Sequence, residues 1–136
     1  MELMVGVAIM AILSAIAYPL YESQSRKGKR PDGMVLLEQV AQGEQRYFSH
    51  MNTFTTTLTD LSGIKSATSP GGYYLITVAP GATGTIASSF VVTATPLGAQ
   101  LKDVCQTFTL SDLGIRGATA TGVSDSNAAR IMCWGK

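Results

Sequence analysis

Charged side chains are scarce in this chain of 136 residues. Asp, Glu, Lys and Arg together make up 14% of the sequence, and the net charge is +1. Soluble globular domains usually have about a quarter of their residues charged. A dedicated nucleic-acid binder carries a strong excess of positive charge, so the overall balance argues against that class. The length fits one domain with an appended element.

Residues that carry catalysis or bind metal are also few. The chain has one histidine, His50, and two cysteines. No group of His, Cys, Asp and Glu has the spacing of a metal site, no glycine-rich phosphate loop occurs, and no serine stands in the glycine-flanked elbow of a hydrolase. We therefore expect neither an enzyme nor a cofactor, and we expect His50 at the surface.

The two cysteines, Cys105 and Cys133, lie close to the C-terminus. A minimal, even count in a chain with a hydrophobic N-terminus favours one disulfide in an exported domain. The alternative is two buried free thiols in a cytosolic protein. Residues 111–136 are rich in Gly, Ala, Thr and Ser and are expected to bury little. A bridge there would stabilise the fold by about 3–4 kcal/mol through loop-closure entropy.

The longest uncharged stretch is at the beginning. Residues 3–21 (LMVGVAIMAILSAIAYPLY) carry no charge, and as a helix they would span about 28 Å, close to one bilayer core. Three interpretations are a transmembrane helix, a cleaved signal peptide with Ala15-Ile16-Ala17 as its cleavage site, and a buried core helix. A signal peptide needs a basic region before its apolar run, and a core helix in so small a protein is rarely apolar on every face.

Two residues mark this stretch, Glu2 before it and Pro19 near its end. A carboxylate at membrane depth costs about 2.5–3.5 kcal/mol on insertion scales and usually has a partner. The first basic residue is Arg26, so a partner for Glu2 would come from another chain, such as its N-terminal amine. Glu2 is then an assembly residue; the alternative is a solvent-reaching end residue. Pro19 lacks a backbone donor and should kink or open the helix.

The segment ELMVGVAIMAILSAIAYPLYESQSRKGKR closely resembles the N-terminal segment of type IV pilins. In that family the mature chain begins with an N-methylated Phe, then Thr-Leu-x-Glu-Leu, then an apolar helix interrupted by proline. Met1-Glu2-Leu3 matches this signature from its fourth residue. The resemblance implies that Glu2 pairs with the amine of a neighbouring subunit and that Pro19 is the helix-interrupting proline. A C-terminal cysteine pair that bounds a loop, as Cys105 and Cys133 would, also resembles pilins.

A basic cluster of Arg26, Lys27, Lys29 and Arg30 follows the apolar stretch. The positive-inside rule alone would place this cluster and the rest of the chain in the cytoplasm, which conflicts with a disulfide. The resemblance removes the conflict, because it implies a basic leader that a prepilin peptidase cleaves on the cytoplasmic side. A DNA-contacting patch is a second interpretation of the cluster. A solvated face, or contacts with acidic groups of neighbouring subunits, is the third.

The rest of the sequence predicts an α+β fold. Residues 34–51 have an apolar stripe at helical spacing, and Pro31-Asp32-Gly33 is expected to interrupt that helix or to start its second half. Strand signals at Tyr73–Ala79, Ile86–Thr95 and Gln106–Leu110 have hairpin spacing, which predicts an antiparallel sheet of three or four strands under the helix. The expected divisions are an apolar protruding helix at 1–25 and a head at 26–136, with an amphipathic helix at about 32–51, a loop at 52–72, a sheet at 73–112 and a disulfide loop at 105–133.

The resemblance implies a structural subunit of a type IV pilus, in which many copies pack their N-terminal helices into a helical filament. Adhesion, twitching motility and DNA uptake are the functions that it implies, with the pilus assembly machinery as a partner. The subunit would lie in the inner membrane with a periplasmic head before assembly, and at the bacterial cell surface afterwards. Alternatives are a minor pilin specialised in DNA binding or assembly priming, a type II secretion pseudopilin, and a monomeric membrane-anchored exported domain. Pseudopilins usually lack the terminal cysteine pair.

Overall fold

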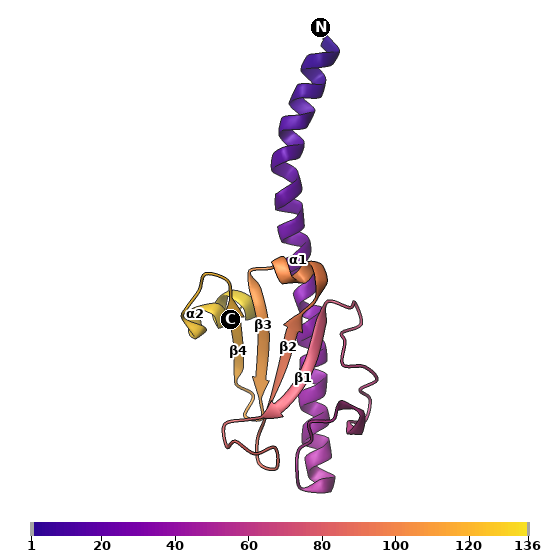
Figure 1. Ribbon diagram of the computed structural model, residues 1–136, viewed down its shortest axis with the longest axis vertical. Coiled ribbons are helices and arrows are strands. Elements are labelled where there is room, and N and C mark those ends of the chain that lie inside the picture. Colours follow the sequence, from indigo (N-terminus) through magenta and orange to yellow (C-terminus); the bar gives the residue numbers. More distant parts are fainter. Residues whose placement is uncertain (1, 136) are drawn as a thin grey trace.

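The computed structural model describes residues 2–135 as a long helix beside a four-stranded sheet. Figure 1 shows that the N-terminal half of the helix projects from the molecule, while its second half lies along the sheet. The α+β fold expected from the sequence is confirmed. In chain order the elements are α1 (Glu2–Met51), η1 (Leu58–Asp60), β1 (Tyr74–Pro80), β2 (Phe90–Pro96), η2 (Gly98–Lys102), β3 (Cys105–Ser111), β4 (Arg116–Ala120) and α2 (Ser126–Trp134).

The sheet is an antiparallel meander in the order β1-β2-β3-β4. Successive side chains of β2 point to opposite faces of the sheet, so every second one lies in the core. Phe90, Val92 and Ala94 are fully buried there. The three strands expected from the sequence are present, and nearly all of their ends lie one residue from the predicted ends. The exception is β2, which begins at Phe90 instead of Ile86, because the residues after Pro80 form hydrogen-bonded turns such as Gly84 N–H to the Gly81 carbonyl.

The second half of α1 covers one face of this sheet. Leu36, Leu37 and Val40 of the predicted apolar stripe are buried, whereas Met51 at its end is exposed. The helix and sheet approach closely at Gly33, where an added Cβ would lie 2.6 Å from the ring of Tyr74. That distance is below van der Waals contact, so only glycine allows this packing.

The predicted break at Pro31-Asp32-Gly33 is wrong, because α1 continues through Pro31. A proline inside a helix costs about 3 kcal/mol. Contacts with the head on both sides of Pro31 offset that cost: Arg30 forms an ion pair with Asp103, and the carboxylate of Asp32 accepts a hydrogen bond from the backbone of Gly71. The helix is therefore held in register by residues far away in the sequence.

Residues 111–135 bury few side chains, as expected from their composition, but they are regular in structure. They form β4 and α2, and Ala118, Ala129 and Cys133 are buried. The side chain of Asp125 caps α2 by accepting a hydrogen bond from the Asn127 backbone at 2.9 Å, which satisfies a free N–H of the first turn. Small side chains suffice here because they allow α2 and β4 to pack closely.

The Cys105–Cys133 disulfide is present, with Cα atoms 5.8 Å apart. Both cysteines are buried, and the bridge joins β3 to α2. Trp134 supports the same junction: its indole N–H donates to the Gly117 carbonyl at 2.8 Å, and its ring meets that of Phe108 edge to face. The alternative of two free thiols is therefore excluded.

Glu44 is a buried carboxylate on the core face of α1, at a position that the sequence pattern did not single out. One of its oxygens accepts a hydrogen bond from the Thr55 backbone at 3.1 Å, and the other has no partner among residues 2–135. Burial raises the pKa of Glu44 above 4.5; the hydrogen bond from Thr55 lowers it, and the nearby charge of Asp60 raises it. Glu44 thus connects α1 to the loop before the sheet at some cost in stability.

Replacing Glu44 by glutamine should stabilise the fold at neutral pH by about 1 kcal/mol, because the amide removes a buried charge that is only half satisfied. The raised pKa means that the carboxyl group favours folding below pH 4.5 and that this contribution is lost as the pH rises through the folded-state pKa. Denaturant unfolding at neutral pH and below pH 4.5 measures this. The account would be contradicted if Glu44→Gln changed the free energy of unfolding by the same amount at both pH values.

Candidate assembly surface

The projecting part of α1 exposes a continuous series of large hydrophobic side chains. Their exposed fractions run from 53% at Ile9 to 87% at Leu3. Globular proteins rarely leave so large an apolar surface in water, and such surfaces usually mark an interaction site. We call this region the projecting apolar helix; its large hydrophobic residues are Leu3, Met4, Val5, Val7, Ile9, Met10, Ile12, Leu13, Ile16, Tyr18, Leu20 and Tyr21.

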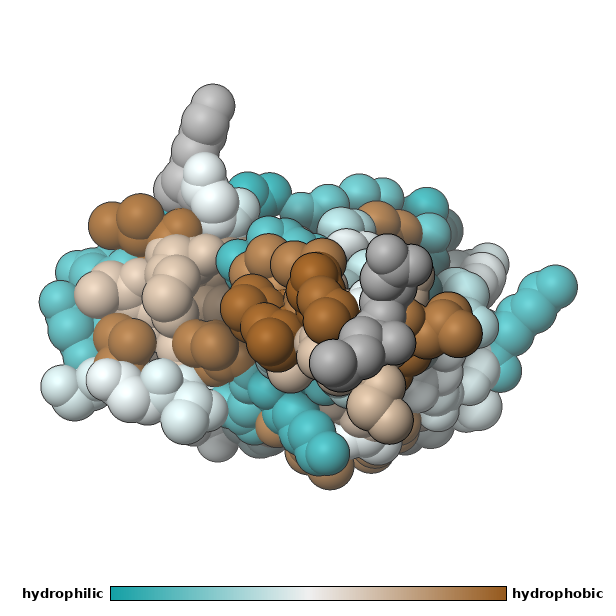
Figure 2. Space-filling view, turned by 90° about the horizontal axis from the view of Figure 1, so that it is seen from above, coloured by the Kyte–Doolittle hydropathy of each residue, from teal (hydrophilic) through white to brown (hydrophobic). Residues whose placement is uncertain are grey.

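The projecting apolar helix is hydrophobic on all sides. Among residues 2–135, α1 is the one helix that is long and apolar enough to cross a membrane, and its most apolar window has a mean hydropathy of 2.2 with none of it buried. Figure 2, a view along the helix from its N-terminal end, shows hydrophobic groups crowded at the centre. Gly6 has open space where a side chain would be. Small residues of this kind allow a second helix to approach closely.

Pro19 lies within the projecting apolar helix, and α1 continues through it in the single subunit, so a kink or local opening at Pro19 stays a prediction. The proline ring leaves the carbonyl of Ala15 without its normal helical donor. The residues on both sides of Pro31 contact the head, whereas all the residues around Pro19 are exposed. A local opening of α1 would therefore cost less at Pro19 than at Pro31. The side chain of Glu2 lies outside the described part of the chain, and its pairing stays a prediction.

The basic cluster of residues 26–30 is divided by the structure. Arg30 forms two charge-assisted hydrogen bonds with Asp103, at 2.6 and 2.7 Å. The ammonium group of Lys29 lies 4.6 Å from the ring centre of Tyr73. Arg26 pairs with Glu22 one helical turn away, at 3.2 Å. Only Lys27 of the four is exposed, so the structure does not bring the cluster together as one basic patch.

A polar cluster joins α1 to the head where the helix meets the sheet. We call it the neck cluster; it consists of Arg30, Tyr74, Gln100 and Asp103. The side-chain amide of Gln100 donates to the Arg26 carbonyl at 2.9 Å and to the Tyr74 hydroxyl oxygen at 3.0 Å. Burial raises the pKa of Tyr74 to about 12, although the hydrogen bond from Gln100 lowers it. The hydroxyl group thus stays protonated at any physiological pH.

Sequence reasoning missed the neck cluster because its central ion pair joins Arg30 to Asp103, which lie 73 positions apart. The sequence places Arg30 in a cluster of four cations and assigns no role to Gln100 or Asp103. One signal was present. Asp103 is the only acid between Asp60 and Asp112, in a region otherwise made of strands and turns. An isolated acid of this kind needs a cation when it is buried.

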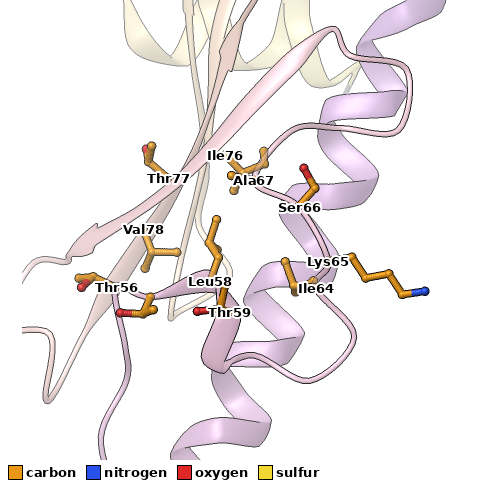
Figure 3. Close-up of a pocket in the computed structure, with 11 residues that line it drawn as sticks. Thr56, Leu58, Thr59, Ile64, Lys65, Ser66, Ala67, Ile76, Thr77 and Val78 are labelled. Atoms are coloured by element: carbon orange, nitrogen blue, oxygen red, sulfur yellow. The ribbon is translucent and has the colours of Figure 1, made fainter.

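A pocket of about 390 Å³ lies between β1 and the loop before it. Figure 3 shows threonine and aliphatic side chains around this pocket, with Lys65 pointing away from it. Within residues 2–135, no group of three or more His, Cys, Asp or Glu is placed to hold a metal ion. His50 is exposed at the end of α1, as expected. The projecting apolar helix is therefore the feature that most needs a functional explanation.

Comparisons with known proteins give one family match and matches to solved structures, among them two pilins. Residues 19–109 match the model of a family described as type IV minor pilin ComP, DNA uptake sequence receptor. The non-core minor pilin PilV of Neisseria meningitidis has 24% identity and a TM-score of 0.56, over 75% of this chain and 94% of PilV. A type IV pilin of Shewanella oneidensis has 24% identity and a TM-score of 0.49, over 74% of this chain and 96% of that pilin. No curated protein sequence matches the chain.

Proposed function

This chain belongs to the type IV minor pilin ComP family, and from that membership we propose that the projecting apolar helix holds it in a pilus filament. The observation that carries the proposal is the complete exposure of this helix beside a well-packed head. Burying one large aliphatic or aromatic side chain contributes about 1.5–3 kcal/mol. A series of them therefore favours any state in which the helix is covered.

Two environments cover the helix in this proposal. Before assembly the bilayer of the inner membrane surrounds it, with the head in the periplasm; its apolar length matches the bilayer core. On assembly, the projecting helices of other subunits replace the lipid. Such contacts join different surfaces of successive subunits, so they propagate as a helical filament at the cell surface. The pilus assembly machinery and a prepilin peptidase are the further partners that we propose.

Glu2 and Pro19 have separate roles in the proposed filament. Glu2 binds a positive group of a neighbouring subunit, which removes the cost of burying a lone carboxylate. Pro19 allows α1 to open locally when neighbouring subunits require it. Adhesion and twitching motility follow from the filament as a whole, whose outer surface is the sheet and the segment closed by the disulfide.

Replacing Glu2 by alanine should abolish or strongly reduce filaments while the head stays folded, because the variant loses the charge that sets the position of one helix against the next. Electron microscopy of surface filaments, with circular dichroism of the purified chain, measures both. Glu22→Ala is the matched control, since Glu22 is exposed and contacts the side chains of Arg26 and Tyr18, each one turn away on α1. A normal filament yield from Glu2→Ala would defeat the assembly role. Monomers without filaments in the unsubstituted protein would defeat the proposed function itself.

A second function is binding of DNA during uptake, which the description of the matched family favours. The cations available for phosphate contacts are few. Lys27, Arg46, Lys65 and Lys102 are exposed, and none of them forms an ion pair within residues 2–135. Four such cations can neutralise only a few phosphates at one time. We therefore propose a DNA receptor in which electrostatic contacts contribute only a small part of the binding free energy.

Binding of duplex DNA by the full chain in detergent should weaken with salt, and its logarithmic slope should be no steeper than about −4, since each neutralised phosphate contributes about −0.9. Fluorescence anisotropy at several salt concentrations measures the slope. Each replacement of a contacting lysine by glutamine should reduce the slope by about one. Gln42→Ala, at an exposed and uncharged position of α1, is the control. Absence of binding, or binding that salt does not change, would exclude this function.

A further inference from the structure

One end of the head is fixed at a definite height above the projecting apolar helix. The segment from η2 to the start of β3, residues 98–104, is attached to α1 by the neck cluster. Gln100 donates to the Arg26 carbonyl at 2.9 Å, and Asp103 binds Arg30 at 2.6 Å. Figure 1 shows this segment at the end of the sheet from which α1 projects. Its position along α1 is therefore the level of Arg26.

This level coincides with the headgroup layer of a bilayer that contains the projecting apolar helix. Residues 3–21 span about 28 Å, which fills the hydrocarbon core. Arg26 lies five residues beyond Tyr21, so it stands about 7–8 Å further along an upright helix. The headgroup region on each side of the core is about 5–8 Å thick. The head cannot move away from this layer without breaking the neck cluster.

The chemistry of this end of the head fits a headgroup layer. Leu101 and Val104 are exposed by 56% and 47% although both are aliphatic. Lys102 lies between them in the sequence and is exposed. Lys27 is also exposed, and it follows Arg26, whose carbonyl binds Gln100. Two acidic residues lie near these lysines in the sequence, and both form ion pairs: Asp103 with Arg30 and Glu22 with Arg26. Figure 2 looks onto this end and shows hydrophobic groups on the head beside the helix as well as on it.

We propose that, before assembly, this end of the head rests on the bilayer, with Leu101 and Val104 in the headgroup layer and with Lys27 and Lys102 beside lipid phosphates. We call these four residues the η2 face. Aliphatic groups flanked by lysines are typical of surfaces that lie at a membrane interface, because the lysine stem stays apolar while its ammonium group reaches phosphate. The proposal rests on the proposed membrane anchoring. It adds that the head is oriented on the lipid and does not rotate freely above it.

Brominated phospholipids test the contact directly, because they quench only tryptophans that touch lipid. The full chain carries one tryptophan, so Trp134→Phe supplies a background in which Leu101→Trp places the reporter on the η2 face. Leu113→Trp is the matched control, since Leu113 is equally an exposed leucine but lies in the β3–β4 turn at the other end of the head. The vesicles contain phosphatidylcholine alone, or phosphatidylcholine and phosphatidylglycerol in equal parts.

We expect a loss of fluorescence at position 101 that is several times the loss at position 113, and that is larger in the anionic vesicles. Adding Lys27→Gln and Lys102→Gln should remove the difference between the two lipid compositions. Equal quenching at 101 and 113, or none at 101, in chains that float with the vesicles would overturn the contact while leaving the anchoring intact. Chains that do not float with vesicles would overturn both.

A second measurement needs no substitution. Backbone amides of residues 101–104 should exchange with deuterium more slowly in vesicles than in short-chain detergent micelles, while amides of residues 112–115 should exchange equally in both. Exchange that is equal in both media at residues 101–104 contradicts the proposal even if the tryptophan variants misfold. Slower exchange over the whole head would indicate a general change in stability and would also count against a contact confined to the η2 face.

Discussion

Replacing Cys105 and Cys133 together by serine is expected to lower the free energy of unfolding by about 3–4 kcal/mol. The bridge spans 28 positions, and closing a loop of that length removes this much chain entropy from the unfolded state. Whole domains have only about 5–15 kcal/mol of stability, so the loss is a large fraction of the total. Urea unfolding of the full chain in detergent, followed by circular dichroism, measures the change.

The loss should appear first at α2. This helix packs on β4, and the disulfide joins it to β3. The single tryptophan, Trp134, lies at the end of α2 with its indole bonded to Gly117, so its fluorescence should shift to longer wavelength at lower urea than the circular dichroism signal changes. The unsubstituted protein after reduction is the control and should behave as the double variant does. An unchanged midpoint in both would contradict the entropic role of the bridge.

The features that could be predicted from sequence are those that depend on neighbouring residues. The uncharged stretch before Tyr21 is visible as a run of letters, and the alternation in Phe90–Pro96 is visible as a strand. The disulfide could be predicted because the chain contains only one possible pair. In each case a short window of sequence contains the whole physical cause, whether it is helical length, a period of two or an even cysteine count.

The features that were missed depend on contacts between distant residues. Pro31 predicts a helix end by its own chemistry, and only Asp103 and Gly71, which bind Arg30 and Asp32, reverse that preference. Propensity is a weak prior when tertiary contacts oppose it. The burial of Ala118 and Ala129 was missed for a related reason. Alanine and glycine carry little hydrophobic signal, so close packing of α2 on β4 has no counterpart in a hydropathy pattern.

The basic cluster shows how the same residues change meaning once they are placed. Four cations in five positions resemble a binding patch when only their order is known. On a helix, however, successive residues point in different directions. Arg30 therefore faces the head and binds Asp103, Arg26 reaches back to Glu22, and Lys27 faces solvent. Charged residues that are neighbours in a helical sequence form one surface patch only when their spacing places them on the same face of the helix.

Replacing Asp103 by alanine is expected to lower the free energy of unfolding by about 3–5 kcal/mol, because it leaves Arg30 without its partner in a site that excludes most water. The side chains of Arg30 and Asp103 are only 11% and 4% exposed. The variant should also unfold in two stages. Without the neck cluster the cost of Pro31 is no longer offset, so hydrogen exchange should increase along residues 26–33 before the sheet opens. Urea unfolding and amide exchange measure the two effects.

Two matched variants separate the buried charge from a general role of this position. Glu22→Ala breaks the exposed pair with Arg26 and should cost no more than about 1 kcal/mol. The combination of Arg30→Met with Asp103→Leu removes both charges and keeps the volume, so it should recover most of the stability lost in Asp103→Ala. If the double variant is as unstable as Asp103→Ala, the stability is lost because the side chains no longer pack, and not because a buried charge is unpaired. If Asp103→Ala costs as little as Glu22→Ala, the neck cluster does not hold α1 to the head.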